Sequence, residues 1–187
     1  NSALNNLTFR PNANFNGSAS FTLTTDDQGA SGATGGALSD TDTVSLTVAA
    51  INDAPTIGNL SQNLRMALSG QTFSISYATL LVALSGIDVD GDTISLRVEQ
   101  VLNGTLNKNE SAVNPGTTSI GPNDVLVWTP PVNTNAAVPA FVLRAVDTAG
   151  VVSASQVTVI IDVATTSRYL RAYNPRTDYH FFTTSQS

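Results

Sequence analysis

The stretch that decides the fold is FVLRAVDTAGVVSASQVTVIID, residues 141–162. It contains two runs rich in β-branched and aromatic residues, and Asp147 and Gly150 stand between them. Alternation of apolar and polar residues is typical of a β-strand that is buried on one face, and Asp and Gly are common in turns. This stretch therefore predicts two strands joined by a turn.

The same pattern occurs earlier in the chain, at an offset of 119 to 121 residues. The stretch FTL at residues 21–23 matches FVL, and Asp27 with Gly29 matches Asp147 with Gly150. The earlier copy also carries a longer loop rich in Gly and Ala, GASGATGGALSD. Since self-similarity at a fixed offset indicates a repeated structural unit, we expect two copies of one domain.

Further stretches of the same type predict an all-β fold with about seven short strands. Strands are expected at residues 20–25, 43–49, 72–76, 93–98, 125–129, 141–146 and 155–163, and a short turn of helix at 77–84. The repeat then sets the domain boundaries. Residues 1–53 are expected to be the C-terminal half of one β-sandwich, 54–163 a complete one, and 164–187 the start of a separate module or tail.

Several motifs occur in a fixed order: LTFRPNANFNGSASFTLTTDDQG, SDTDTVSLTV, INDAP, TLLVALSGIDVDGDTISLRVEQVLNGTL, VLVWTP and VDTAG. In this order they resemble the bacterial cadherin-like, immunoglobulin-like tandem repeats of large secreted surface proteins and adhesins. The resemblance covers roughly residues 4 to 163. It implies tandem Greek-key β-sandwich domains of the cadherin/Ig-like type, neighbouring repeats of the same chain as partners, and an extracellular location, secreted or at the cell surface.

Twelve of the fourteen acidic residues are Asp, and three of them stand at alternate positions in Asp88-Val89-Asp90-Gly91-Asp92. Their carboxylates repel one another unless a cation lies among them, and Ca²⁺ takes hard oxygen ligands from flexible loops. A turn whose Asp side chains accept backbone N–H groups is the alternative. The resemblance implies calcium bound at the domain junction, with these ligands: Asn52, Asp53, Asp88, Asp90, Asp92 and Asp147. Ala50 stands where the family usually has a further Asp, so fewer ions are expected here.

Composition excludes several other classes of function. The chain has no Cys, so thiol catalysis and thiolate zinc sites are excluded, and the single His180 and the two Glu residues lie in no catalytic motif. We therefore expect no enzyme. Lys108, which is expected in a polar loop (LNKNE), is the only lysine, and the seven arginines are scattered, so nucleic acid is not an expected partner. The longest apolar run, residues 77–84, is too short for a membrane helix.

These observations favour a non-catalytic extracellular structural or adhesive module, a calcium-stiffened spacer of a bacterial surface or secreted protein. Two alternatives are a calcium-dependent carbohydrate-binding module and a fibre subunit completed by intermolecular strand exchange. The expected partners beyond neighbouring repeats are a cell-surface protein or polysaccharide, and a second copy that binds through the incomplete N-terminal domain.

Overall fold

The computed structural model describes residues 7–29, 36–60, 64, 66–165, 169–173 and 180–184. The chain divides into two compact units, Asn1–Asn52 and Asp53–Ser187, called unit 1 and unit 2 below. In the part of the chain that the structure describes, strands hold 46% of the residues and helix 5%, which confirms the mostly-β class.

Unit 1 contains the hairpin of β1 (Gly17–Asp26) and β2 (Ser39–Val48), which pair antiparallel along their whole length. One face carries apolar pairs, Phe21 opposite Val44 and Ala19 opposite Leu46, and becomes polar further along, where Leu23 lies opposite Asp42. The other face carries Ser and Thr, and the hydroxyls of Thr24 and Thr41 lie 3.0 Å apart. The alternation of the sequence thus gives part of the hairpin one apolar and one hydroxyl face.

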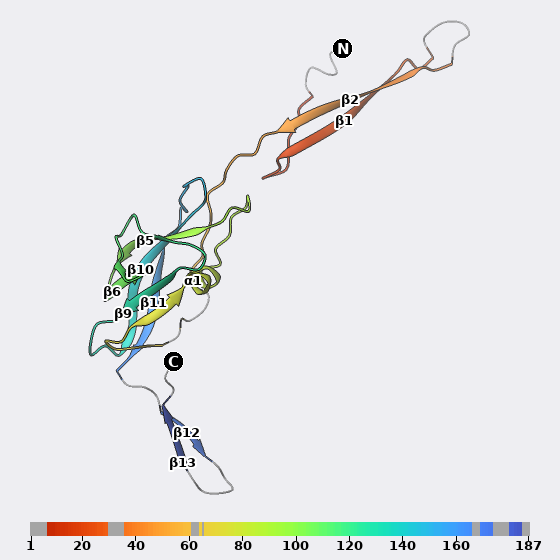
Figure 1. Cartoon of the computed structure of the whole chain (residues 1–187). Coiled ribbons are helices and arrows are strands. Elements are labelled where there is room, and N and C mark those ends of the chain that lie inside the picture. The colour runs from red at the N-terminus through yellow and green to blue at the C-terminus, as the bar shows by residue number, and fades with distance from the viewer. Residues whose placement is uncertain are drawn as a thin grey trace. The chain divides into compact units, whose positions relative to one another are not determined.

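Unit 2 contains two sheets (Figure 1). The five-stranded sheet has the order β3-β11-β10-β5-β8 and the four-stranded sheet the order β4-β9-β6-β7. The strands of the first are β3 (Ala67–Leu68), β11 (Val157–Ala164), β10 (Ala136–Val146), β5 (Ser95–Val101) and β8 (Ser119–Ile120). Those of the second are β4 (Phe73–Ser76), β9 (Val125–Thr129), β6 (Thr105–Lys108) and β7 (Ser111–Ala112). A separate pair is formed by β12 (Tyr169–Tyr173) and β13 (His180–Thr184).

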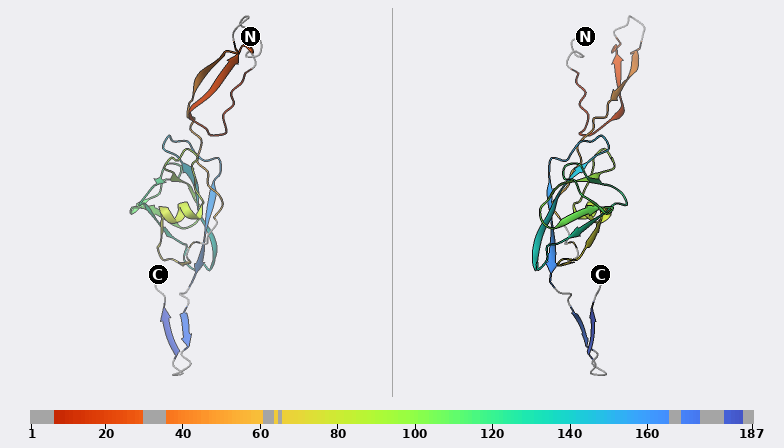
Figure 2. Two further views of the ribbon diagram at one scale, coloured as in Figure 1. Left: turned by 90° about the vertical axis from the view of Figure 1, so that its right-hand side faces the viewer. Right: turned by 60° about the vertical axis from the view of Figure 1, so that its left-hand side comes forward.

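One apolar core joins the two sheets of unit 2, and the views in Figure 2 show its strands in two layers. The five-stranded sheet contributes Phe141 and Ile161, and the four-stranded sheet contributes Trp128 and Leu126, all fully buried. Such a sheet-on-sheet arrangement is a β-sandwich. Trp128 and Phe141 are therefore core residues of the sandwich.

The buried Trp128 also explains a glycine at the end of the sandwich. Its indole N–H donates to the carbonyl oxygen of Asn103 at 2.8 Å, and the chain then turns at Gly104 with φ +74°. A Cβ on Gly104 would lie 2.2 Å from the carbonyl oxygen of Thr129. Only glycine fits this close approach of two backbones.

The short helix α1 (Tyr77–Ala83) follows β4 directly, as the sequence predicts for residues 77–84. Ser76 caps it by accepting the N–H of Thr79, and Tyr77 packs inward and donates its hydroxyl to the carbonyl oxygen of Ile94. No helix in the described part of the chain is long and apolar enough to cross a membrane.

Some details differ from the sequence-based expectations. Lys108, expected in a loop, is the last residue of β6. The short strands β3, β7 and β8 have no counterpart among the predicted strands, because two residues are too few to show an alternation. Within the C-terminal segment, residues 166–168, 174–179 and 185–187 lie outside the described residues, and a separate module there stays a prediction.

Candidate functional site

The acidic loop of unit 2 is a turn stabilised by its own first carboxylate. Oδ1 of Asp88 accepts the backbone N–H of Asp90 at 2.9 Å and that of Asp92 at 3.3 Å. Gly91 closes the turn with φ +83° and donates its N–H to the carbonyl oxygen of Asp88. The alternative interpretation was a turn in which Asp side chains accept backbone N–H groups. That interpretation accounts for Oδ1 of Asp88.

The other carboxylate oxygen of Asp88 has a different environment. Oδ2 is a buried atom, and no group among the described residues forms a hydrogen bond with it. A buried carboxylate oxygen without a donor is costly, because it loses its water and gains no replacement. This oxygen is the one feature of the loop that the turn leaves unexplained.

The start of unit 2 lies against this loop. Asp53 donates its backbone N–H to Oδ2 of Asp90 at 2.7 Å. Thr56 and Ile87 exchange both of their backbone hydrogen bonds, at 2.8 and 3.0 Å. Three of the predicted ligand residues, Asp53, Asp88 and Asp90, therefore lie along two chain segments that run side by side.

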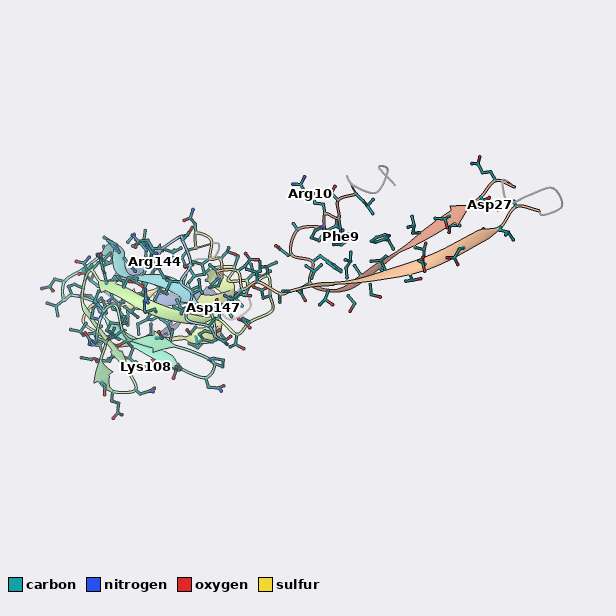
Figure 3. The ribbon with its side chains drawn as sticks, turned by 90° about the horizontal axis from the view of Figure 1, so that it is seen from above. Phe9, Arg10, Asp27, Lys108, Arg144 and Asp147 are labelled. Atoms are coloured by element: carbon teal, nitrogen blue, oxygen red, sulfur yellow. The ribbon has the colours of Figure 1, made fainter. Side chains whose placement is uncertain are left out.

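The strand register places Asp147 at the end of the five-stranded sheet where the acidic loop lies. It follows Val146, which pairs with Ser95 at the start of β5, and Asp92 precedes Ser95 by three residues. The residue is buried, with 5% of its surface exposed, and Figure 3 shows it within unit 2. Its Oδ1 accepts the N–H of Val151 at 2.7 Å, so it also stabilises the turn between β10 and β11.

The same hydrogen-bond pattern occurs in unit 1. Asp147 donates its N–H to the carbonyl oxygen of Val151, and Asp27 donates its N–H to that of Leu38. In return, Val151 and Leu38 donate their N–H groups to the Asp carboxylates, at 2.7 and 2.8 Å. Two hairpins far apart in sequence thus begin their turns in the same way, although the loop of unit 1 is longer.

The predicted ligands are only partly brought together. No three Asp, Glu or His side chains of the described residues form a ready-made metal centre. Asp53, Asp88, Asp90 and Asp92 share one turn and its neighbouring segment, and Asp147 lies at the same sheet end. Asn52 is the last residue of unit 1, and its part in the site stays a prediction.

Two arrangements of charged residues are not evident from the sequence. Lys108 contacts Oδ2 of Asp124 at 2.8 Å, and this hydrogen bond, together with one from the N–H of Gly121, lowers the pKa of Asp124 below its usual value. Arg97 and Arg144 are direct cross-strand neighbours on β5 and β10. The two arginines are 47 positions apart in the sequence, so only the strand register reveals that they are neighbours.

Comparison with known proteins supports the resemblance stated above. The sequence profile of the family described as "Bacterial Ig domain" matches residues 52–160, more than half of the chain. Comparisons with curated proteins and with solved structures found no significant match.

Proposed function

Because the chain belongs to the bacterial Ig domain family, we propose that it is a calcium-stiffened spacer of a bacterial surface or secreted protein. Domains of this family are typically non-catalytic modules of extracellular or surface proteins. The proposal adds calcium, and one observation carries it: the start of unit 2 lies against an acidic loop in which Oδ2 of Asp88 has no donor among the described residues.

The donor set fits calcium in its chemistry. Ca²⁺ takes six to eight oxygen ligands at about 2.3–2.6 Å, often from flexible loops and including backbone carbonyls. Asp88, Asp90 and Asp92 would supply carboxylates, with Asp53 and Asp147 beside them. Because these groups are not yet gathered as a metal centre, we expect small rearrangements of the turn on binding.

The mechanical consequence concerns the residues that precede the loop. In the structure, the N–H of Asp53 donates a hydrogen bond to Asp90. Thr56 is joined to Ile87 by two backbone hydrogen bonds. A cation shared by Asp53 and the loop would remove rotational freedom from this segment. The chain would then stiffen at the point where unit 2 begins.

The test compares the chain in calcium and in chelator. With calcium we expect a higher melting temperature and a narrower distribution of sizes in small-angle X-ray scattering. Asp90→Asn is the decisive variant, since an amide oxygen can still accept the N–H of Asp53 while the charge is lost; it should abolish the calcium effect and keep the fold. Asp162→Asn, an exposed Asp on β11, is the matched control. An equal melting temperature and scattering profile with and without calcium would contradict the proposal.

A second candidate function rests on the hairpin of unit 1. Its apolar face is incompletely covered: the exposed fraction is 37% for Val44 and 50% for Phe9 of the same unit. In unit 2, Phe141, which matches Phe21 of β1 in the repeat, is fully buried, and β10 pairs with β5 on its second edge. The hairpin thus offers a face and an edge on which strands of another chain could complete a sandwich.

A further inference from the structure

The outer side of β11 in unit 2 borders an open groove of ≈ 640 Å³. Its lining includes the polar side chains of Asn59, Gln156, Thr158 and Asp162 and the apolar side chains of Leu60 and Ile160. Amide, hydroxyl and carboxylate groups are suited to hydrogen bonds with hydroxyls, and the volume is within the range of about 300–1,000 Å³ of small-ligand sites. This lining fits a sugar chain, whose rings present hydroxyls at the edges and C–H groups on the faces.

A pair of arginines lies on the same five-stranded sheet. Arg97 on β5 and Arg144 on β10 are directly opposite each other, an arrangement that is unfavourable for like charges unless an anion lies between or beside them. Arg97 donates its Nε–H to Glu99 at 2.7 Å. Arg144 donates only to a carbonyl oxygen, that of Ser153, at 3.1 Å, and no carboxylate of the described residues lies within salt-bridge distance of it. Of these two cations, only Arg97 thus has an anionic partner among the described residues.

Strand register connects this pair to the groove. Gln156, which lines the groove, precedes Val157, and Val157 pairs with Leu143, the neighbour of Arg144. Asp162 lines the groove five residues further along β11 than Val157, roughly 17 Å away at about 3.4 Å per residue. The groove therefore runs from a cationic end toward an anionic end, and a bound chain would place its acidic group near Arg144.

Among the side chains that the structure describes, Lys108 is the remaining cation of unit 2, and it does not extend this site. Lys108 is engaged with Asp124 and with the carbonyl oxygen of Ser119, and Figure 3 shows it away from Arg144. A nucleic acid needs a row of cations along its phosphates, and two arginines do not supply one. A single oxyanion group on an otherwise neutral chain matches the charge that is present.

We propose that the groove along β11, together with Arg144 and Arg97, binds a polysaccharide that carries oxyanion groups, either carboxylates or sulfates. The arginine pair holds the oxyanion, because a guanidinium donates two parallel hydrogen bonds to it. The groove residues bind the neighbouring sugar hydroxyls. This site uses none of the proposed calcium ligands, so binding does not require calcium.

The experiment measures binding of the whole chain to immobilised polygalacturonate, dextran sulfate and neutral dextran, at about 0.1 M salt and in chelator. At this ionic strength charges more than about 10 Å apart are largely screened, so the net charge of the chain has little influence. We expect at least one acidic polymer to bind tighter than neutral dextran, by about tenfold or more, which corresponds to one charge-assisted contact of about 1.4 kcal/mol. The two acidic polymers distinguish a carboxylate from a sulfate.

Variants then test the assignment to Arg144. Arg144→Gln should weaken binding of the preferred polymer about tenfold, and Arg144→Lys should weaken it less, because the charge remains while the two-pronged donor is lost. Arg10→Gln in unit 1 is the matched control, since Arg10 is exposed and the change in net charge is the same. Thermal unfolding of each variant checks the fold. Equal binding of acidic and neutral polymers, or equal losses for Arg144→Gln and Arg10→Gln, would overturn the proposal.

Discussion

Lys108 shows how a single side chain holds together parts of unit 2 that are distant in sequence. Its ammonium group donates to the carbonyl oxygen of Ser119 at 2.7 Å and contacts Asp124 at 2.8 Å, so the end of β6 is tied to β8 and to the residue that precedes β9. Both side chains of the ion pair are about one quarter exposed, so the pair contributes at most about 1 kcal/mol to folding.

The lowered pKa of Asp124 predicts an acid-sensitive part of the stability. Its folded pKa lies below the unfolded value of about 3.9, mainly because of the hydrogen bond from Lys108. The folded state therefore binds protons less readily, and this contribution is complete above the unfolded pKa and disappears as the pH falls through the folded pKa. Lys108→Met should be less stable than wild type at pH 7, and the difference should shrink at pH 3.

Urea unfolding at the two pH values measures this effect, with Arg10→Gln as the control cation. The hydrogen bond of Lys108 to Ser119 does not titrate with Asp124, so only the pH-dependent part of the difference belongs to the ion pair. A difference of the same size at pH 7 and pH 3 would show that Asp124 contributes nothing through its charge.

Which residues could be predicted from the sequence depends on how local their interactions are. The Asp-Val-Asp-Gly-Asp turn could be predicted from the sequence because its hydrogen bonds join residues two and four positions apart. The contact of Asp53 with Asp90 was expected only through the family resemblance, since the two residues are 37 positions apart. The pair of Arg97 and Arg144 was missed, because no local pattern specifies which positions of two strands become neighbours.

At the level of elements, the turn between β10 and β11 allows the structural role of Asp147 to be separated from its proposed metal-binding role. Asp147→Asn keeps an oxygen that can accept the N–H of Val151, whereas Asp147→Ala leaves this donor without its partner. We expect the Ala variant to be less stable than the Asn variant by about 1–3 kcal/mol, the cost of an unsatisfied buried group.

Chemical unfolding in chelator measures the stability of the turn without any contribution from a metal. Calcium titration of the Asn variant then reports the second role, because that variant keeps the turn and lacks the charge. Equal stability of the Ala and Asn variants in chelator would mean that the hydrogen bond from Val151 does not contribute to the free energy of unfolding.

Elements of sufficient length were predictable, and shorter ones were not. β9 was expected at residues 125–129 and has these bounds, and the expected strand at residues 141–146 forms the second half of β10. The first half, Ala136–Ala140, lacks a clear alternation because Pro139 and a register shift interrupt it. The strand β6 was not predicted from the sequence, because its residues Asn107 and Lys108 are polar. In the structure they pair with Val127 and Leu126 of β9. Tertiary pairing outweighs local propensity at such positions.

At the level of the whole molecule, the two units have different means of stabilisation. Unit 2 buries a continuous core between two sheets, and more than twenty apolar residues belong to it. The described part of unit 1 has one hairpin, whose apolar residues are only partly covered. A two-stranded hairpin is marginally stable in water by itself, whereas a sandwich folds independently.

Hydrogen exchange should therefore differ between two hairpins that share the same turn pattern. In dilute solution we expect the amides of β10 and β11 to be protected by nearly the full unfolding free energy of unit 2, and those of β1 and β2 to exchange almost as in an unfolded chain. If the hairpin of unit 1 accepts strands from a second copy, its protection should rise with protein concentration, together with the mass in light scattering, while the protection of β10 and β11 stays constant. A version that lacks residues 1–52 should remain monomeric over the same range. Strong protection of β1 and β2 in the dilute monomer would show that unit 1 is stable without a partner, and strand exchange would then have no driving force.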